Sequence, residues 1–208
     1  MRSATTAVFV LVVCVSVGPA FAQPPDPFVS LTLNPAGQTV NLGEMAHVTI
    51  GISGLAHGMP PALAMFELGL GFDPTILSFD SVFFGDQVAG IDFLAPFGPA
   101  GSTTVSDIIA PGTLVLHEVA MGPPVLVGMQ PDAFNLATVT FNAIGPGTSP
   151  LVLGAVILAD EQHNPLWPDP FFLPGEITVA SPIPAPGSFL LGMAEVGLFV
   201  RLRRGKVL

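Results

Sequence analysis

Short segments in which apolar and polar residues alternate are the feature that most restricts how this 208-residue chain can fold. The strongest of them, residues 66–72, reads FELGLGF, so that every second side chain is large and apolar. A period of two places these side chains on one face of a β-strand, whereas a helix buries a stripe with a period of about 3.6 residues. No part of residues 28–180 carries a sustained stripe with the helical period. The pattern therefore predicts an all-β fold.

Turn-forming residues separate the alternating segments. The chain contains 23 glycines and 23 prolines, and these residues, together with Asn and Asp, favour turns between strands. Many short strands joined by turns favour two antiparallel sheets packed face to face. We therefore expect an antiparallel β-sandwich of jelly-roll type with about nine strands. The predicted strands are residues 28–33, 48–52, 66–72, 77–84, 103–109, 113–121, 137–143, 151–158 and 176–179.

Three segments depart from simple alternation. Residues 151–158, LVLGAVIL, are apolar at both odd and even positions, which predicts a strand covered on each side or, alternatively, a short helix. Residues 85–101 and 163–174 are rich in proline and predict long loops. Trp167, in the second loop, is expected either to take part in recognition or to form a lid over the end of the core.

The N-terminus has the three parts of a secretory signal peptide, predicted here as residues 1–22. A positive charge at Arg2 precedes an apolar run over residues 7–17, and an A-x-A pattern at residues 20–22 predicts a mature start at Gln23. The apolar run is shorter than the roughly 20 residues needed to cross a bilayer, which argues against a membrane anchor. We therefore expect an exported protein, extracellular or held at the cell envelope.

The body between the two ends, residues 23–182, is long enough for one domain with its own core. The only cysteine, Cys14, lies inside the predicted signal, so the exported chain has no thiol for a disulfide, a zinc site or nucleophilic catalysis. Burial of apolar surface must therefore supply the stability of this domain.

The charges of the chain are strongly segregated. The net charge is −10, and no Lys or Arg occurs between Ser3 and Val200. Without cations the body cannot neutralise phosphates, which excludes nucleic acid as a partner. The one-sided acidity favours a divalent cation or a basic partner instead.

Residues able to carry out catalysis are scattered. The sequence contains no G-x-S-x-G, H-E-x-x-H or glycine-rich phosphate-binding motif, and its four histidines fall in separate segments. The carboxylates are interpreted as lying in turns and at outward strand positions, where solvent surrounds them. We therefore expect a protein that is not an enzyme and that has no cofactor, with calcium as the one candidate ion.

One loop offers ligands for that ion. Asp160, Glu161 and Asn164 lie close together in the sequence and supply the hard oxygen atoms that Ca²⁺ prefers. Their spacing does not match an EF-hand loop. Calcium binding at these three residues is therefore a prediction from residue type and proximity.

The order of several motifs in the body resembles a bacterial cohesin domain. Residues 41–44 (NLGE) form a Gly-acidic turn before an alternating strand, residues 72–77 (FDPTIL) match an aromatic-D-P-x-x-L signature, and residues 175–179 (GEITV) match a closing G-x-I-x-V strand. The resemblance implies a jelly roll that binds a protein partner of the dockerin type, although it assigns no partner-contacting residues. Carbohydrate-binding modules share this jelly roll, so polysaccharide binding at the cell surface or in a biofilm is the alternative.

The C-terminal segment, residues 183–208, resembles a PEP-CTERM sorting tail. A P-x-P motif precedes the apolar residues 189–200 and a basic end, although Ala185 replaces the usual Glu and Glu195 interrupts the apolar stretch. The resemblance implies that the tail alone contacts the inner membrane, with its basic end in the cytoplasm, until an exosortase processes it. The alternative is an amphipathic C-terminal segment. The predicted sorting residues are Pro184, Ala185, Pro186, Gly187, Arg201, Arg203 and Arg204.

Overall fold

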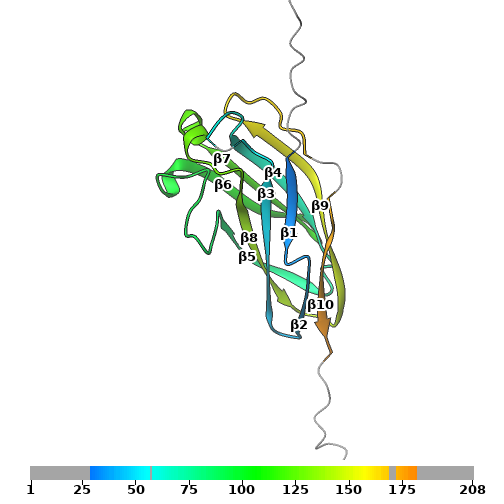
Figure 1. The fold of residues 1–208 in the computed structure, drawn as a ribbon. Coiled ribbons are helices and arrows are strands. Elements are labelled where there is room, and N and C mark those ends of the chain that lie inside the picture. The colour runs from blue at the N-terminus through cyan, green and yellow to red at the C-terminus, as the bar shows by residue number, and fades with distance from the viewer. Residues whose placement is uncertain (1–28, 57, 169–171, 182–208) are drawn as a thin grey trace, which may run out of the picture.

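Ten strands in two packed sheets make up most of the computed structural model, which describes residues 29–56, 58–168 and 172–181 (Figure 1). One sheet has four strands in the order β1 (Ser30–Asn34), β3 (Met45–Ser53), β8 (Ala133–Ala143) and β5 (Leu77–Phe84). The other has six, in the order β2 (Gly37–Asn41), β10 (Gly175–Ala180), β9 (Gly147–Asp160), β4 (Leu63–Gly71), β7 (Thr113–Ala120) and β6 (Ser102–Ala110).

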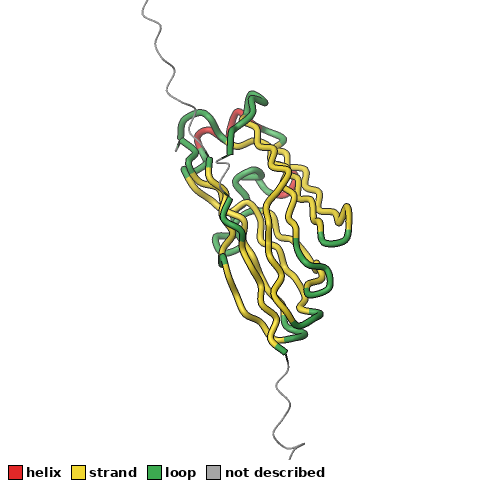
Figure 2. The backbone as a smooth tube through the Cα atoms, turned by 90° about the vertical axis from the view of Figure 1, so that its right-hand side faces the viewer, coloured by secondary structure: helices red, strands yellow, loops and turns green. Residues whose placement is uncertain are grey.

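The two sheets form the predicted β-sandwich of jelly-roll type. Neighbouring strands pair antiparallel except β10 and β2, which run parallel. Two short 3-10 helices, Pro99–Gly101 and Pro123–Gly128, accompany the strands. A view along the layers shows strands through the body and loops gathered at its ends (Figure 2). Among the described residues, no helix has the length and apolar character needed to span a membrane.

All nine predicted strands are present, and a tenth was missed. Residues 77–84 form β5 at the predicted bounds, whereas β8 begins at Ala133, four residues before the prediction. The missed strand, β2, reads GQTVN and leaves all five residues at least partly exposed. It therefore carries no alternating apolar signal, and its pairing with β10 holds it in the sheet.

The inward side chains of the alternating segments form the core. Phe66, Leu68 and Leu70 on β4 are fully buried, as predicted, and face the fully buried Ile50 and Phe141 of the other sheet. Each such side chain contributes roughly 1.5–3 kcal/mol when it leaves water. This burial holds the sheets together without a disulfide.

The turn after β4 shows how local chemistry ends a strand. Asp73 Oδ1 accepts hydrogen bonds from the backbone N–H (2.8 Å) and the hydroxyl (2.6 Å) of Thr75. These bonds stabilise the charged carboxylate, the hydroxyl bond most, and lower the pKa of Asp73. Gly112 lies against this turn with φ +77°, and a Cβ there would clash with the Phe72 carbonyl oxygen. The Asp73 turn therefore requires glycine at position 112.

Two expectations about burial were wrong. Residues 151–158 lie in β9, and only one face of this strand is covered, because β9 belongs to a sheet that packs against the other sheet on one side only. The carboxylate of Glu118 is not solvated, because Glu118 occupies an inward position on β7 and is fully buried. The exposed side of residues 151–158 forms part of the candidate site, and Glu118 lies beside a cavity.

Candidate functional site

The outer face of the six-stranded sheet carries a set of apolar side chains. Strand register places them on the same side of four adjacent strands, away from the core. Val105, Val152 and Ile157 expose 50%, 51% and 51% of their surface, and the others are half-buried. We call this surface the apolar face, and its residues are Met65, Val105, Val115, Val119, Val152 and Ile157.

A polar pair lies at the centre of the apolar face. The Glu67 carboxylate on β4 lies 3.6 Å from His117 Nδ1 on β7, and the two side chains are 43% and 28% exposed. Glu67 pairs with Ile157 on β9, and His117 pairs with Val105 on β6. His117 Nδ1 makes no hydrogen bond to any described residue. Because this nitrogen atom is itself buried, the exposed Glu67 carboxylate is the polar contact that the pair offers inside an apolar surround. Specific interfaces combine affinity with orientation in this way.

Two glycines in the middle of the apolar face leave it without projecting side chains. Gly69 on β4 pairs with Gly154 on β9, and a Cβ at Gly69 would lie 2.9 Å from the Gly154 carbonyl oxygen. The strand register shifts beside this pair, and Ala155 follows with φ +47°. A bulge of this kind re-aims the side chains that follow it. As a result, Ile157 points outward opposite Glu67 although the strict alternation is broken.

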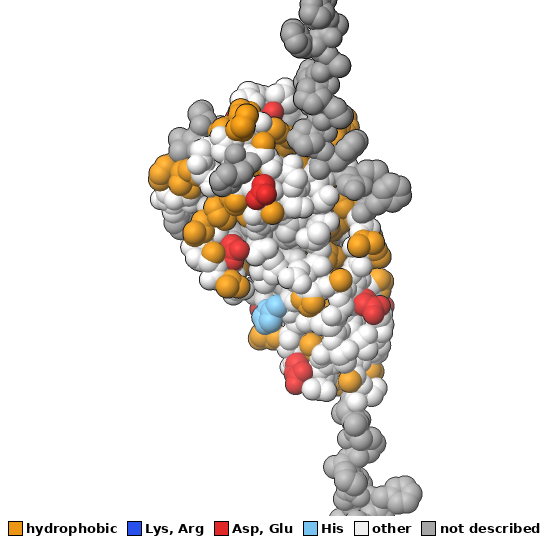
Figure 3. All heavy atoms as spheres, viewed as in Figure 1, with side chains coloured by type: hydrophobic (Ala, Val, Ile, Leu, Met, Phe, Trp, Pro, Cys, Tyr) orange, Lys and Arg blue, Asp and Glu red, His pale blue; other side chains and the backbone are white. Residues whose placement is uncertain are grey.

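The outer face of the four-stranded sheet is different, because its polar side chains pair with one another. Thr49 and Thr138 share a hydrogen bond of 3.1 Å between hydroxyls, and His47 Nδ1 lies 3.0 Å from Thr140 Oγ1. Figure 3, in the view of Figure 1, shows a surface that is mostly neither hydrophobic nor charged, with scattered acidic side chains and one histidine. The hydrogen-bonding groups of this face are largely satisfied within the sheet. Met45 and Phe83 are also exposed on it, but they lie on different strands at separate register positions.

Of the three predicted calcium ligands, Asp160 ends β9, and Glu161 and Asn164 lie in the loop that follows. The side chains of Asp160 and Asn164 contact each other, whereas Glu161 contacts Ala62. Asp160 Oδ1 accepts N–H groups of Gln162 (2.9 Å) and Asn164 (2.7 Å), and its Oδ2 accepts the Asn164 side-chain amide (3.0 Å). Glu161 Oε2 accepts the backbone N–H of Ala62 at 2.8 Å. Among the described residues, no group of three or more His, Cys, Asp or Glu side chains is placed to hold a metal ion. Calcium binding stays a prediction.

Other predicted features lie outside the described residues. These are the signal peptide, residues 1–22, and all of the predicted sorting residues from Pro184 to Arg204. Trp167 is described and is 60% exposed, while its carbonyl oxygen accepts the Val29 N–H at 3.3 Å. Its backbone therefore joins the loop to the start of β1, and its ring remains available at the surface.

The apolar face was not predicted from the sequence, although a signal for it was present. The uninterrupted apolar run of residues 151–158 was interpreted as a strand covered on both sides. The same pattern arises when one face enters the core and the other forms an exposed apolar surface. Of this run, Leu151, Leu153 and Leu158 are buried, and Val152 and Ile157 are exposed.

Comparisons with known proteins identify the fold. No protein-family model matches the sequence, and no curated protein matches it either. Solved structures do match, and the architecture they share with the chain is the jelly-roll β-sandwich. A cohesin in a type I cohesin–dockerin complex from Clostridium thermocellum has a TM-score of 0.58 and 13% identity, over 77% of this chain and 99% of that one.

Two further structures extend the comparison. A cohesin from Clostridium acetobutylicum has a TM-score of 0.56 and 17% identity, over 74% of this chain and 92% of that one. A type II cohesin domain from the cellulosome of Acetivibrio cellulolyticus has a TM-score of 0.54 and 15% identity, over 74% and 95%. The chain therefore has a cohesin-like fold, as the sequence motifs predicted.

Proposed function

We propose that this protein is a non-catalytic interaction module that binds a protein partner, of the dockerin type, through the apolar face. The observation that carries the proposal is the cluster of half-exposed aliphatic side chains around the Glu67–His117 pair. Contiguous exposed apolar surface on a soluble domain marks sites that another molecule covers. Cohesins in several of the similar solved structures are in complexes with dockerins, which supports a partner of that kind.

The character of the apolar face favours protein over polysaccharide. Sugar rings stack on exposed aromatic side chains, whereas the six residues of this face are Met, Val and Ile. Aliphatic side chains around one polar pair instead suit a protein surface with apolar anchors of its own. The carboxylate of Glu67 further favours a partner with a basic group at the matching position.

The proposal includes a location outside the cytoplasm. The predicted signal peptide would export the domain, and the tail resembling a PEP-CTERM segment would hold it at the inner membrane until an exosortase processes it. N-terminal sequencing of the exported protein should find Gln23 as its first residue. A first residue upstream of the A-x-A pattern would contradict the predicted signal.

Binding measurements with purified components test the proposed function. Biosensor titrations with a panel of purified dockerin modules should give a dissociation constant in the micromolar range or below for at least one of them. Ile157→Asp should weaken that binding at least about tenfold, because it would bury one unpaired carboxylate at the interface. The double variant T49V/T138V on the opposite face should keep it. Retention on cellulose or on the producer's exopolysaccharide, with no dockerin bound, would overturn the proposal in favour of the polysaccharide alternative.

A further inference from the structure

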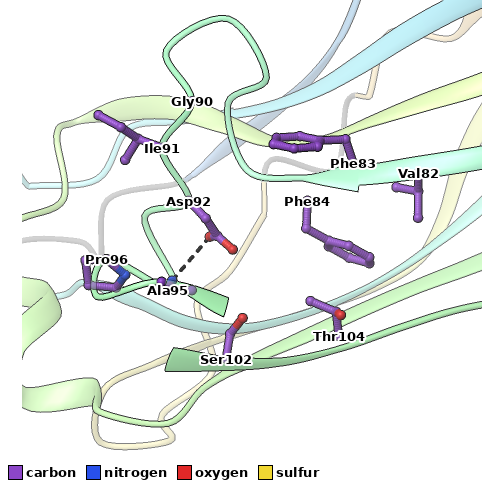
Figure 4. A pocket seen from close by; sticks show the side chains of 11 residues that line it. Val82, Phe83, Phe84, Gly90, Ile91, Asp92, Ala95, Pro96, Ser102 and Thr104 are labelled. Carbon is purple, nitrogen blue, oxygen red and sulfur yellow. Dashed lines mark hydrogen bonds between the residues drawn. The ribbon is translucent and has the colours of Figure 1, made fainter. Parts of the chain in front are cut away.

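A cavity opens between the two sheets, on the inner side of β6. Its volume is about 450 Å³, within the roughly 300–1,000 Å³ typical of small-molecule sites. The end of β5, the start of β6 and the loop between them form its walls (Figure 4). Figure 4 shows Phe84, Ser102 and Thr104 directed into the space beside the Asp92 carboxylate. The cavity therefore combines apolar walls with oxygen atoms at one end.

A buried carboxyl group adjoins this oxygen-lined end. Glu118 on β7 pairs with Thr104 in the strand register, so the two side chains lie on the same inner side of the sheet. Glu118 is fully buried, and its carboxyl oxygens make no hydrogen bond of ordinary geometry to a described residue, although the Ser102 hydroxyl and the Asp92 carboxyl lie close enough to act on its pKa. A buried carboxyl without such a bond is costly, which makes Glu118 a candidate to pair with a ligand in the adjoining cavity.

The surroundings of Glu118 keep its carboxyl protonated near neutral pH. Burial, the largest cause, and the nearby Asp92 carboxyl raise the pKa of Glu118 to about 8, while the Ser102 hydroxyl acts in the opposite direction. Asp92 is the titratable group that acts on Glu118 from a neighbouring element. One Asp92 oxygen accepts N–H groups of Leu94 (2.9 Å) and Ala95 (3.3 Å), which fixes the side chain beside the cavity.

No cation of the domain can compensate this pair of carboxyl groups. Residues 3–200 contain no Lys or Arg, so any cation that pairs with Glu118 once it ionises must come from outside that stretch. A primary ammonium group needs three acceptors. Asp92 and Ser102 line the cavity, and the Glu118 carboxyl, which lies beside them behind the cavity wall, would supply the third once the ligand reaches it. Ca²⁺ takes six to eight oxygen ligands, more than these side chains offer. The apolar walls, formed in part by Val82 and Phe84, would accommodate a methylene chain.

We propose that this cavity binds a primary alkylammonium group, whose charge pairs with Glu118 and Asp92 while its carbon chain lies against Val82 and Phe84. A lysine side chain of another protein and a free alkylamine present the same chemistry. The cavity lies on the inner side of the six-stranded sheet, opposite the apolar face, so the proposal stands or fails independently of dockerin binding.

Binding should release a proton, because Glu118 must ionise to pair with the ammonium. Calorimetric titration of the purified chain with n-butylammonium is therefore the test, run at pH 6, 7.5 and 9 in two buffers of different ionisation enthalpy. The affinity should rise about tenfold per pH unit below pH 8 and level off above it, since the ligand itself stays protonated up to about pH 10. n-Butanol, which has the same carbon chain without the charge, should not bind.

Two variants separate the site from a general effect of charge. Glu118→Gln should abolish proton release and weaken the binding of n-butylammonium at least tenfold at pH 9. Asp80→Asn, which removes an exposed carboxylate on the four-stranded sheet, should change neither quantity. Thermal unfolding checks that Glu118→Gln folds. The same measurement should show that this variant loses the pH dependence of the free energy of unfolding that Glu118 causes. The folded pKa of about 8 lies above the ordinary value of 4.5, so this carboxyl makes the free energy of unfolding fall as the pH rises through that window.

Further titrations identify the source of the ammonium. Tighter binding of Nα-acetyl-lysine N-methylamide than of n-butylammonium would support the site and identify a protein lysine as its ligand, and the reverse order would support it with a free amine. The absence of binding by both ligands at pH 9 would overturn the proposal. So would CaCl₂ binding that excludes the amine and is lost in Glu118→Gln.

Discussion

The two outer faces of the sandwich differ in how their side chains are arranged toward solvent. On the four-stranded sheet, cross-strand pairs such as Thr49–Thr138 satisfy polar groups within the protein. On the six-stranded sheet, Val105, Val152 and Ile157 remain half exposed around the Glu67–His117 pair. Satisfied polar surface needs nothing further, whereas exposed aliphatic surface is stabilised when another molecule covers it. The difference is the reason to expect the proposed partner on the six-stranded sheet.

The largest expected effect comes from placing charge on the apolar face. The double variant V152D/I157D should weaken dockerin-type binding at least about 100-fold, because it would bury two unpaired carboxylates at the interface. Biosensor titration measures this loss, with T49V/T138V as the matched pair on the other face. Equal losses in both double variants would remove the functional distinction between the two faces.

The next effect concerns the contribution of the outer face of the four-stranded sheet to the stability of the domain. Thr49→Val should lower the free energy of unfolding by about 1–2 kcal/mol, because it leaves the hydroxyl of Thr138, which is only 6% exposed, without its partner. Urea denaturation measures the change. Removal of both hydroxyls leaves no hydroxyl without a partner. The free energy of unfolding of T49V/T138V should therefore fall by less than the sum of the decreases in the two single variants. Strict additivity would show that the bond contributes nothing.

A smaller effect is expected at the centre of the apolar face. Glu67→Gln should change the free energy of unfolding by less than about 1 kcal/mol, because both members of the Glu67–His117 pair reach solvent. Thermal and urea unfolding at pH 6 and pH 8 provide the measurement. A larger loss would mean that the pair holds the sheet together and is not reserved for a partner.

The smallest effect should come from a neutral change at the edge of the apolar face. Ile157→Thr should alter the free energy of unfolding by no more than about 0.5 kcal/mol, since half of the side chain is already in water. Leu158→Ala, at the adjacent buried position, should cost about 2–5 kcal/mol in the same urea experiment. If the two variants were equally destabilised, the apolar face would be part of the core.

Strand existence could be predicted from the sequence because alternation records which side of a strand is buried. Residues 66–72 are the clearest case, since Phe66, Leu68 and Leu70 all reach the core. The strand β2 escaped prediction because its backbone hydrogen bonds with β10, and not side-chain burial, keep it in the sheet. Pairing of that kind leaves no trace in the local pattern.

The candidate sites were harder to predict, because each joins residues that are distant in sequence. The apolar face combines residues from Met65 to Ile157, and only the run 151–158 gave a local signal. Glu118 could have been noticed, because it follows Leu114 and Leu116 at the inward position of an alternating strand. Its approach to Asp92, however, depends on how the long loop folds back over β6. The calcium prediction rested on residue type and on proximity in sequence, neither of which fixes the direction in which a side chain points.

The parallel pairing of β2 with β10 has a mechanical consequence. The described chain enters the sandwich at the end where Ser30 pairs with Ser53, and leaves β10 at the opposite end, where Ala180 pairs with Asn41. A force that pulled these two points apart would load the β2–β10 hydrogen bonds in shear, so that several must yield together. A domain tethered at one terminus and under tension from the other would therefore unfold more slowly than one whose strands separate one bond at a time.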